Sequence, residues 1–137
     1  MTHHAFMVGS DGSSLASYGV LGQGKPHPRS YGCYPRFFGR YVLQEGLLSM
    51  EDSIRRMTSF PAQRFGLTNR GLLRQNMFAD IVILDPKKVI DIATFKDPHQ
   101  YSKGVEYVLV NGTVVIDDGK FTGQLTGKTL RHETHEP

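Results

Sequence analysis

The chain has 137 residues, a net charge of +3, 39% hydrophobic residues, 15 Gly and 7 Pro, so it is long enough for one loop-rich domain and too short for two. Its single cysteine, Cys33, excludes an internal disulfide framework and a thiolate metal cage within the chain. Because no apolar run approaches the roughly 20 residues of a membrane span, and no charged-then-apolar leader opens the sequence, we expect a cytoplasmic protein without membrane contact.

A short strand and a long loop are the first predicted elements. Residues 5–9 form an apolar run that stops at Ser10-Asp11-Gly12, which predicts a buried strand ending in a turn. Residues 13–36 lack any period and are rich in Gly, Pro, Ser and Tyr. An irregular stretch of that length is commonly a functional loop, and we predict one here.

A helix is predicted from residue 50 onward. Ser49 is placed to cap its first turn, and Asp52 occupies the capping-box position three residues later. One face of this helix carries three apolar residues, Met50, Ile54 and Met57.

A second short helix is predicted after Ser59, with Pro61 in its first turn. Ala62 and Phe65 are expected to point inward, and Gly66 is the expected C-terminal stop.

The pattern changes to that of a sheet from about Gly71. Residues 80–85 are a continuous, β-branched run that Pro86 closes, which predicts a strand buried on both faces and central in its sheet. We expect residues 71–127 to form the ordered core as a small antiparallel β unit, and the polar tail from about residue 128 to be frayed.

A hairpin is predicted within this unit. Residues 105–110 and 113–118 flank Asn111-Gly112, the dipeptide whose positive φ values suit a type I′ turn.

Asp11 is the first residue that could carry chemistry. A carboxylate just past the end of a buried strand lies where α/β-barrel enzymes hold catalytic groups, with a metal or a water as its partner. The alternative is that Ser10-Asp11-Gly12 is simply a turn.

Arg29 is the second candidate, in the His27-Pro28-Arg29 sequence of the long loop. A guanidinium there could hold a substrate carboxylate through two parallel hydrogen bonds, and the alternative is a solvated surface arginine. Cys33 is interpreted as a small apolar filler rather than a nucleophile, because no predicted helix start lies near it to lower its pKa.

The histidines form no metal-ligand pair. His3 and His4 are adjacent, so on a strand their side chains point to opposite faces, and His99, His132 and His135 lie in a loop and in the tail.

Charge is unevenly distributed along the chain. Residues 1–74 carry a net charge of +5 with eight arginines, and residues 75–137 carry −2. An arginine-rich half with tyrosines could bind nucleic acid, but these arginines are scattered among Pro, Gly and Phe, so we predict no nucleic-acid binding.

Taken in order, these segments resemble the N-acyl-D-amino-acid deacylases, or D-aminoacylases, of the amidohydrolase superfamily. The His-Pro-Arg loop after Ser-Asp-Gly is the part more specific to this branch, whereas Ala-Asp before the apolar run and Val-Asn-Gly are general to the superfamily. The resemblance covers residues from about 5 to about 131. The matching segments are residues 9–12, 24–32, 35–41, 46–49, 57–59, 61–62, 66–67, 70–73, 79–86, 94–95, 97–98 and 110–112.

The resemblance implies a metal-dependent hydrolase, with zinc as the family's cofactor, that removes the acyl group from small-molecule N-acyl-D-amino acids. It implies an α+β fold, with the last strand and helices of an (α/β)8 barrel at residues 1–68 and a small antiparallel β-sheet segment with a frayed tail at 69–137. Asp11 would be catalytic, accepting a proton from the metal-bound water and passing it to the leaving amine. Arg29 would hold the substrate carboxylate, with His27 as a second substrate-binding residue.

The sequence also departs from the family. It begins at what would be the last barrel strand, so the family's His-x-His pair, its other metal-binding histidines and its metal-ligating cysteine are absent, and Cys33 does not match that cysteine. A barrel needs roughly 250 residues. We therefore expect a C-terminal fragment that binds no zinc and is inactive alone. The alternative is a free-standing β-rich interaction module without catalysis, which buries its orphaned strand by forming homo-oligomers.

Overall fold

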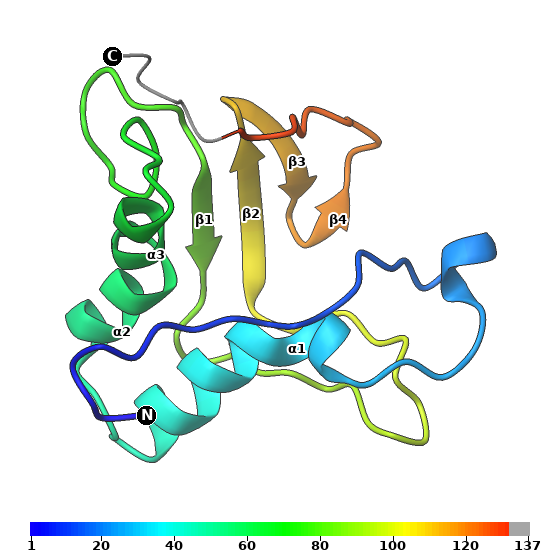
Figure 1. The fold of residues 1–137 in the computed structure, drawn as a ribbon. Coiled ribbons are helices and arrows are strands. Elements are labelled where there is room, and N and C mark those ends of the chain that lie inside the picture. The colour runs from blue at the N-terminus through cyan, green and yellow to red at the C-terminus, as the bar shows by residue number, and fades with distance from the viewer. Residues whose placement is uncertain (132–137) are drawn as a thin grey trace.

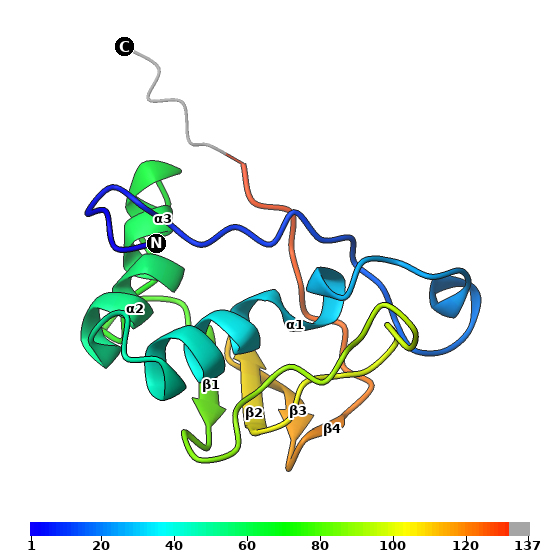
Figure 2. The ribbon, with the colours of Figure 1, turned by 90° about the horizontal axis from the view of Figure 1, so that it is seen from below.

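Three α-helices precede a four-stranded antiparallel sheet in the structure, a computed structural model that describes residues 1–131 (Figure 1). Figure 2 shows α1, α2, α3 and the N-terminal segment on one side of the row of strands. No helix within residues 1–131 is long and apolar enough to cross a membrane. The elements in chain order are η1 (Val20–Gly22), α1 (Arg29–Pro35), η2 (Arg36–Gln44), α2 (Met50–Met57), α3 (Ser59–Arg64), β1 (Ile81–Leu84), β2 (Val105–Val110), β3 (Thr113–Asp117) and β4 (Lys120–Phe121).

The hairpin prediction is confirmed. β2 and β3 pair antiparallel, and the two residues between them, Asn111 and Gly112, have φ values of 52° and 82°. Positive φ at both central positions is the geometry of a type I′ turn, whose twist matches that of the strands it joins.

The prediction of a central, doubly buried strand at residues 80–85 is wrong. The strand order is β1-β2-β3-β4, so β1 is an edge strand. Val82 and Ile83 are 57% and 51% exposed. A run of apolar side chains indicates what a strand can bury, but nothing within residues 1–131 covers these two side chains.

A polar network fastens β1 to the hairpin turn. The backbone N–H of Asn111 donates to Asp80 Oδ1 at 2.8 Å, and Arg70 binds both the Asp80 carboxylate and Asn111 Oδ1. The side-chain amide of Asn111 donates in turn to the Thr126 carbonyl at 2.6 Å. This end of the sheet is therefore held by hydrogen bonds and charge rather than by packed side chains.

Helix α2 begins where the sequence predicts. Ser49 Oγ accepts a hydrogen bond from the Asp52 backbone N–H at 3.2 Å, which satisfies one of the free donors of the first turn. The buried face of α2 differs from the expected apolar face, however. Its buried residues are Ser53 and Arg56, while Met50 and Ile54 are 43% and 44% exposed.

Helix α3 is confirmed in position and only partly in its inward face. Ala62 is 7% exposed, but Phe65 is 66% exposed, so the prediction that Phe65 points inward is wrong. Gly66, with a φ of +69°, follows the helix in the left-handed conformation expected of a C-terminal stop.

The predicted loop at residues 13–36 is wrong in its second half, because α1 begins at Arg29 and continues directly into η2, a π-helix. Pro35 lies inside this helical run and has no N–H to donate to the Tyr31 carbonyl four residues earlier. Ser102 Oγ donates to that carbonyl instead, at 3.0 Å. The helix therefore tolerates its proline because a distant segment supplies the missing donor.

The prediction of a small antiparallel β unit within residues 71–127 is confirmed, but most of the buried hydrophobic core lies outside that range. The core joins the N-terminal segment, η2 and the stretch after β1. Its buried cluster is Val8, Phe37, Phe38, Val42 and Val89. Gly39 lets η2 approach this stretch closely, because a Cβ there would lie 2.0 Å from the Val89 carbonyl oxygen.

The N-terminal segment is not the strand predicted at residues 5–9. No strand within residues 1–131 pairs with it, and only Val8 of this run is buried. Residues 128–131 have no regular secondary structure. Residues 132–137, which include His132, His135 and the rest of the tail predicted to fray, lie outside the described residues.

Candidate functional site

The two main candidates, Asp11 and Arg29, lie together at the start of α1. Arg29 Nη2 is 2.6 Å from Asp11 Oδ2, and the two side chains are 44% and 85% exposed. The residues are far apart in sequence, and the fold joins them because the segment after Gly9 passes over the first turn of α1. The structure thus brings one carboxylate and one guanidinium to a single exposed point.

The backbone around Asp11 is held against α1 at close range. The Ser13 N–H donates to Ser30 Oγ at 3.4 Å, and a Cβ on Gly12 would lie 3.0 Å from the Ser30 Cα. Asp11 itself has a φ of +47°, a left-handed conformation that aspartate tolerates better than most residues. The turn at Asp11 therefore lies directly against the first turn of the helix.

His27 lies beside Arg29, and its ring shapes the loop. Its Nδ1 accepts the backbone N–H of Arg29 at 3.1 Å. The ring meets Phe95 edge-on, with centroids 4.9 Å apart. His27 thus fixes the backbone at Arg29, and a hydrogen bond to substrate would have to come from its other ring nitrogen, Nε2.

Two residues of the segment 99–101 form hydrogen bonds with the stretch predicted as a loop, residues 13–36. Sequence analysis did not predict these contacts. His99 Nε2 lies 3.0 Å from the Gly24 carbonyl, and because a carbonyl only accepts, Nε2 is the donor. In the neutral ring Nδ1 then accepts from the Tyr31 O–H at 2.7 Å. Burial, with a smaller effect of Tyr101, raises the pKa of Tyr31 and keeps this donor protonated. Tyr101 in turn accepts the Ser17 N–H at 3.3 Å.

Cys33 behaves as the filler that the sequence indicates. Its side chain packs against the core cluster, and burial raises the pKa of its thiol. A thiol with a raised pKa is a poor nucleophile at neutral pH.

A metal site is not formed by these residues. Within residues 1–131 no three His, Cys, Asp or Glu side chains come together in a way that could hold a metal ion. Asp11 supplies a carboxylate at the candidate site, but its partner is a guanidinium. The described residues therefore do not fit zinc by themselves.

Comparison with known proteins identifies the family of this chain. The model of the amidohydrolase family matches residues 7–116. The chain belongs to the amidohydrolase family. The match begins just before Asp11 and ends within β3, so it includes both candidate residues and most of the sheet.

Curated relatives of this chain include deacylases. The chain is 41% identical to a D-aminoacylase of Alcaligenes xylosoxydans xylosoxydans over 124 residues, which is 90% of the chain and 24% of the relative. It is 42% identical to an N-acyl-D-glutamate deacylase of the same organism over 131 residues, which is 96% of the chain and 25% of the relative. The chain thus spans about a quarter of the length of these relatives.

Solved structures of deacylases are also similar to this chain. A D-aminoacylase crystal structure superposes with a TM-score of 0.76 at 40% identity, covering 86% of this chain and 23% of that one. An N-acyl-D-glutamate deacylase from Bordetella bronchiseptica, complexed with zinc and a phosphonate mimic of the tetrahedral intermediate, superposes with a TM-score of 0.75 at 40% identity, covering 87% of this chain and 24% of that one. Related deacylases therefore bind zinc, and the small antiparallel sheet belongs to an amidohydrolase fold.

Proposed function

We propose that this chain is the C-terminal part of a metal-dependent hydrolase that cleaves the amide bond of N-acyl-D-amino acids. The observation that carries the proposal is the 2.6 Å contact between Asp11 and Arg29 at the start of α1. The relatives support the reaction class, because they include a D-aminoacylase and deacylases of N-acyl-D-aspartate and N-acyl-D-glutamate at 40% to 42% identity.

Arg29 binds the carboxylate of the substrate. A guanidinium presents a planar fork that matches a carboxylate through two parallel hydrogen bonds. In the chain alone the carboxylate of Asp11 occupies this fork. Exposed ion pairs of this kind contribute only about 0–1 kcal/mol, so a substrate carboxylate replaces Asp11 at little cost. His27, which fixes the Arg29 backbone, is a second residue of the same substrate site.

Asp11, once released from Arg29, moves the proton. Its carboxylate accepts a proton from the water that attacks the amide carbonyl and returns it to the departing nitrogen. The water oxygen bonds to the carbonyl carbon, the C–N bond breaks, and the products are a carboxylic acid and a D-amino acid. Asp11 ends the cycle ionised, as it began.

Residues 1–131 do not form a metal site by themselves, so further residues are needed to hold the metal of such an enzyme. We propose that residues 1–68 belong to the barrel part and residues 69–137 to the small β part of the complete fold. The exposed Val82 and Ile83 of β1 support this arrangement, since each leaves an apolar side chain, on opposite faces of the sheet, for the rest of the enzyme to cover. The isolated chain is accordingly expected to be inactive and to bind no stoichiometric zinc.

Nucleic-acid binding receives no support from the arginines. Six of the eight in residues 1–74 form ion pairs with carboxylates. These carboxylates neutralise much of the basic charge of this half in place, which weakens its electrostatic attraction to a phosphate backbone.

The test joins this chain to the barrel portion of the D-aminoacylase that is 41% identical to it. Asp11→Asn in the joined protein should lower kcat by a factor of about 100 to 10,000, because it removes the proton-transfer group. Arg29→Lys should mainly raise KM, since a lysine gives a point charge in place of a planar fork.

A second exposed arginine–carboxylate pair provides matched controls. Arg40 and Glu45 pair at 3.0 Å on η2 and its C-terminal cap, so Glu45→Gln and Arg40→Lys should leave both kinetic constants unchanged. Near-normal turnover of the Asp11→Asn protein would refute the role of Asp11. A folded, zinc-loaded joined protein without deacylase activity would refute the function and favour the interaction-module alternative, for which the edge strand β1 would offer a binding surface.

A further inference from the structure

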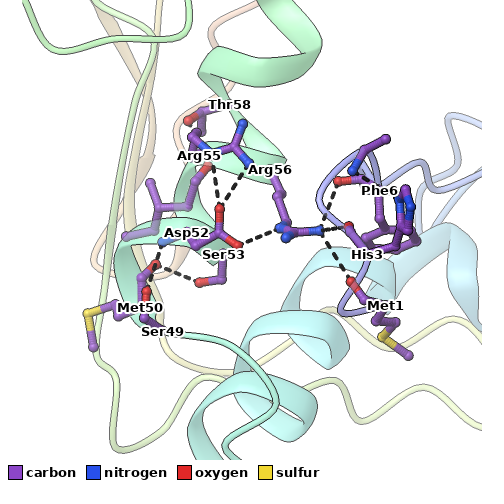
Figure 3. Close-up of polar contacts among 12 residues, drawn as sticks. Met1, His3, Phe6, Ser49, Met50, Asp52, Ser53, Arg55, Arg56 and Thr58 are labelled. Atoms are coloured by element: carbon purple, nitrogen blue, oxygen red, sulfur yellow. Dashed lines mark hydrogen bonds and ion pairs between the residues drawn. The ribbon is translucent and has the colours of Figure 1, made fainter.

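The N-terminal segment is held by side chains rather than by a strand ladder. Arg56, on α2, has a side chain only 4% exposed. Its Nη1 donates toward three carbonyl oxygens of the segment, those of Met1 at 3.2 Å, His3 at 2.5 Å and Phe6 at 3.3 Å (Figure 3). One buried guanidinium thus replaces the hydrogen bonds that a neighbouring strand would have made.

The position of this guanidinium is itself fixed. Arg56 Nε donates to Asp52 Oδ2 at 2.7 Å, one turn earlier on α2, and Arg55 Nε donates to the other Asp52 oxygen at 3.0 Å. These bonds, the one from Arg56 foremost, lower the pKa of Asp52, so the carboxylate stays ionised at neutral pH. A buried arginine that lost these partners would pay a large desolvation cost, which keeps Arg56 and the segment together.

Further hydrogen bonds extend along the segment toward Asp11. The Val8 N–H donates to the Arg56 backbone carbonyl at 3.3 Å. The Tyr34 O–H donates to the Val8 carbonyl at 3.3 Å, and the Cys33 S–H lies 3.7 Å from the Gly9 carbonyl. Burial raises the pKa of both Tyr34 and Cys33, so both remain protonated donors. The backbone is therefore held from residue 1 to within two residues of Asp11.

Register along this segment decides whether Asp11 reaches Arg29. Extended chain advances about 3.3 Å per residue, so a slip of one residue would carry the Asp11 carboxylate out of its 2.6 Å contact. We propose that Arg56 is a positioning residue, whose grip on the Met1, His3 and Phe6 carbonyls sets the register that presents Asp11 to Arg29. The consequence for catalysis rests on the function proposed above, whereas the geometric part concerns this chain alone.

The test uses the 137-residue chain and two neighbouring arginines. Arg56→Lys keeps the positive charge but cannot reach three carbonyls and Asp52 together. The Val8 amide should then exchange its proton at least about ten times faster relative to the Ser53 amide of α2, which bonds to the Ser49 carbonyl at 3.0 Å. The carboxyl ¹³C signal of Asp11 should also move to the position it takes in an Arg29→Gln chain, where the ion pair is absent.

Arg55→Lys is the matched control, because Arg55 binds the same Asp52 carboxylate and is not among the partners of the segment. It should change neither signal. Equal acceleration of Val8 and Ser53 in the Arg56→Lys chain would show that Arg56 only stabilises the fold, and an unchanged Asp11 signal would overturn the positioning role. Arg56→Gln, compared at a temperature where circular dichroism shows the same helix content as the unsubstituted chain, repeats the test with the charge removed.

Activity of the joined protein separates this inference from the proposed function. Arg56→Lys there should lower kcat about tenfold or more with KM unchanged, because Arg29 stays on α1 while Asp11 shifts. An inactive joined wild type would refute the proposed function and leave the exchange and ¹³C results to decide the role of Arg56. An active one in which Arg56→Lys raises KM alone would contradict the inference.

Discussion

The core around η2 and the four-stranded sheet are stabilised in different ways. In the core, Phe37, Phe38 and Val42 are between 2% and 5% exposed and pack against Val89. In the sheet no residue of β1 to β4 is fully buried, and β1 is an open edge. The core is held by packing, whereas the sheet depends on its backbone ladder and on the hydrogen bonds of Asp80 and Asn111. The chain spans about a quarter of the length of its relatives. Its described residues bury the core around η2 and leave the sheet partly exposed.

Truncation of one phenylalanine in each region should show the largest difference in stability between the core and the sheet. Phe38 is 2% exposed and Phe121, on β4, is 51% exposed. Phe38→Ala should lower the free energy of unfolding by about 3–5 kcal/mol because it leaves a cavity, and Phe121→Ala by less than about 1 kcal/mol.

Urea unfolding of both variants measures the difference. Where Phe38→Ala fails to fold, Phe38→Leu gives a milder version of the same comparison. Equal losses at the two positions would mean that the sheet is packed as tightly as the core.

The sequence predicted the elements whose determinants are local. The Asn111-Gly112 hairpin and the Ser49 cap follow from a dipeptide and from a four-residue spacing, and both are confirmed. The burial of β1 was predicted wrongly for a different reason. Its apolar run has the character of a covered strand, but the cover is not among residues 1–131, and no local pattern reveals that.

Distant contacts explain the remaining errors. Gly32 and Pro35 weaken any prediction of a helix, yet α1 forms because Ser102 replaces the donor that proline lacks and because Gly32 leaves room for Asp91. The burial of Arg56 was missed since a charged residue on a helix usually faces solvent. Asp11 and Arg29 came from a turn pattern and a family resemblance, but their contact depends on the path of the chain.

Two glycines have similar positive φ values but different surroundings, one beside the core and one in the sheet. Gly104, at the entrance to β2, has a φ of +77°, and a Cβ there would lie 2.4 Å from the Val89 nitrogen of the core. Gly112, in the hairpin turn, has a φ of +82° and open space around it. Gly112→Ala should cost about 1–2 kcal/mol for the left-handed conformation, and Gly104→Ala should cost a further 1–3 kcal/mol or so for the clash.

Thermal unfolding of both glycine variants, with Gly46→Ala as a third left-handed position in open space, gives the measurement. A Gly104→Ala protein no less stable than Gly112→Ala would indicate that the stretch at Val89 yields easily, and that the core and the sheet are not tightly joined there.

Acid titration gives the smallest expected effect and compares one carboxylate from each region. In the core region, the hydrogen bond from Arg56 is the main cause that lowers the pKa of Asp52. Beside β1, the hydrogen bond from Lys88 is the main cause that lowers the pKa of Asp85, and the Lys87 backbone N–H is the next. A carboxylate whose pKa is lower in the folded state stabilises the fold while it is ionised. Its contribution is therefore complete above the unfolded pKa of about 4 and is lost as the pH falls through the lower, folded value.

Asp52→Asn and Asp85→Asn should each flatten the fall of the unfolding free energy below about pH 4, as urea unfolding between pH 7 and pH 2.5 would measure. Asp52→Asn should in addition lower stability at pH 7, because it leaves the buried Arg56 without its carboxylate, whereas Lys88, 68% exposed, keeps its hydration in the Asp85→Asn protein. Glu51→Gln on the same helix controls for the loss of a carboxylate. A steep acid dependence that survives both substitutions would assign the acid sensitivity of this fold to other carboxylates, and an unchanged stability of Asp52→Asn at pH 7 would show that the Met1, His3 and Phe6 carbonyls alone suffice to hold Arg56.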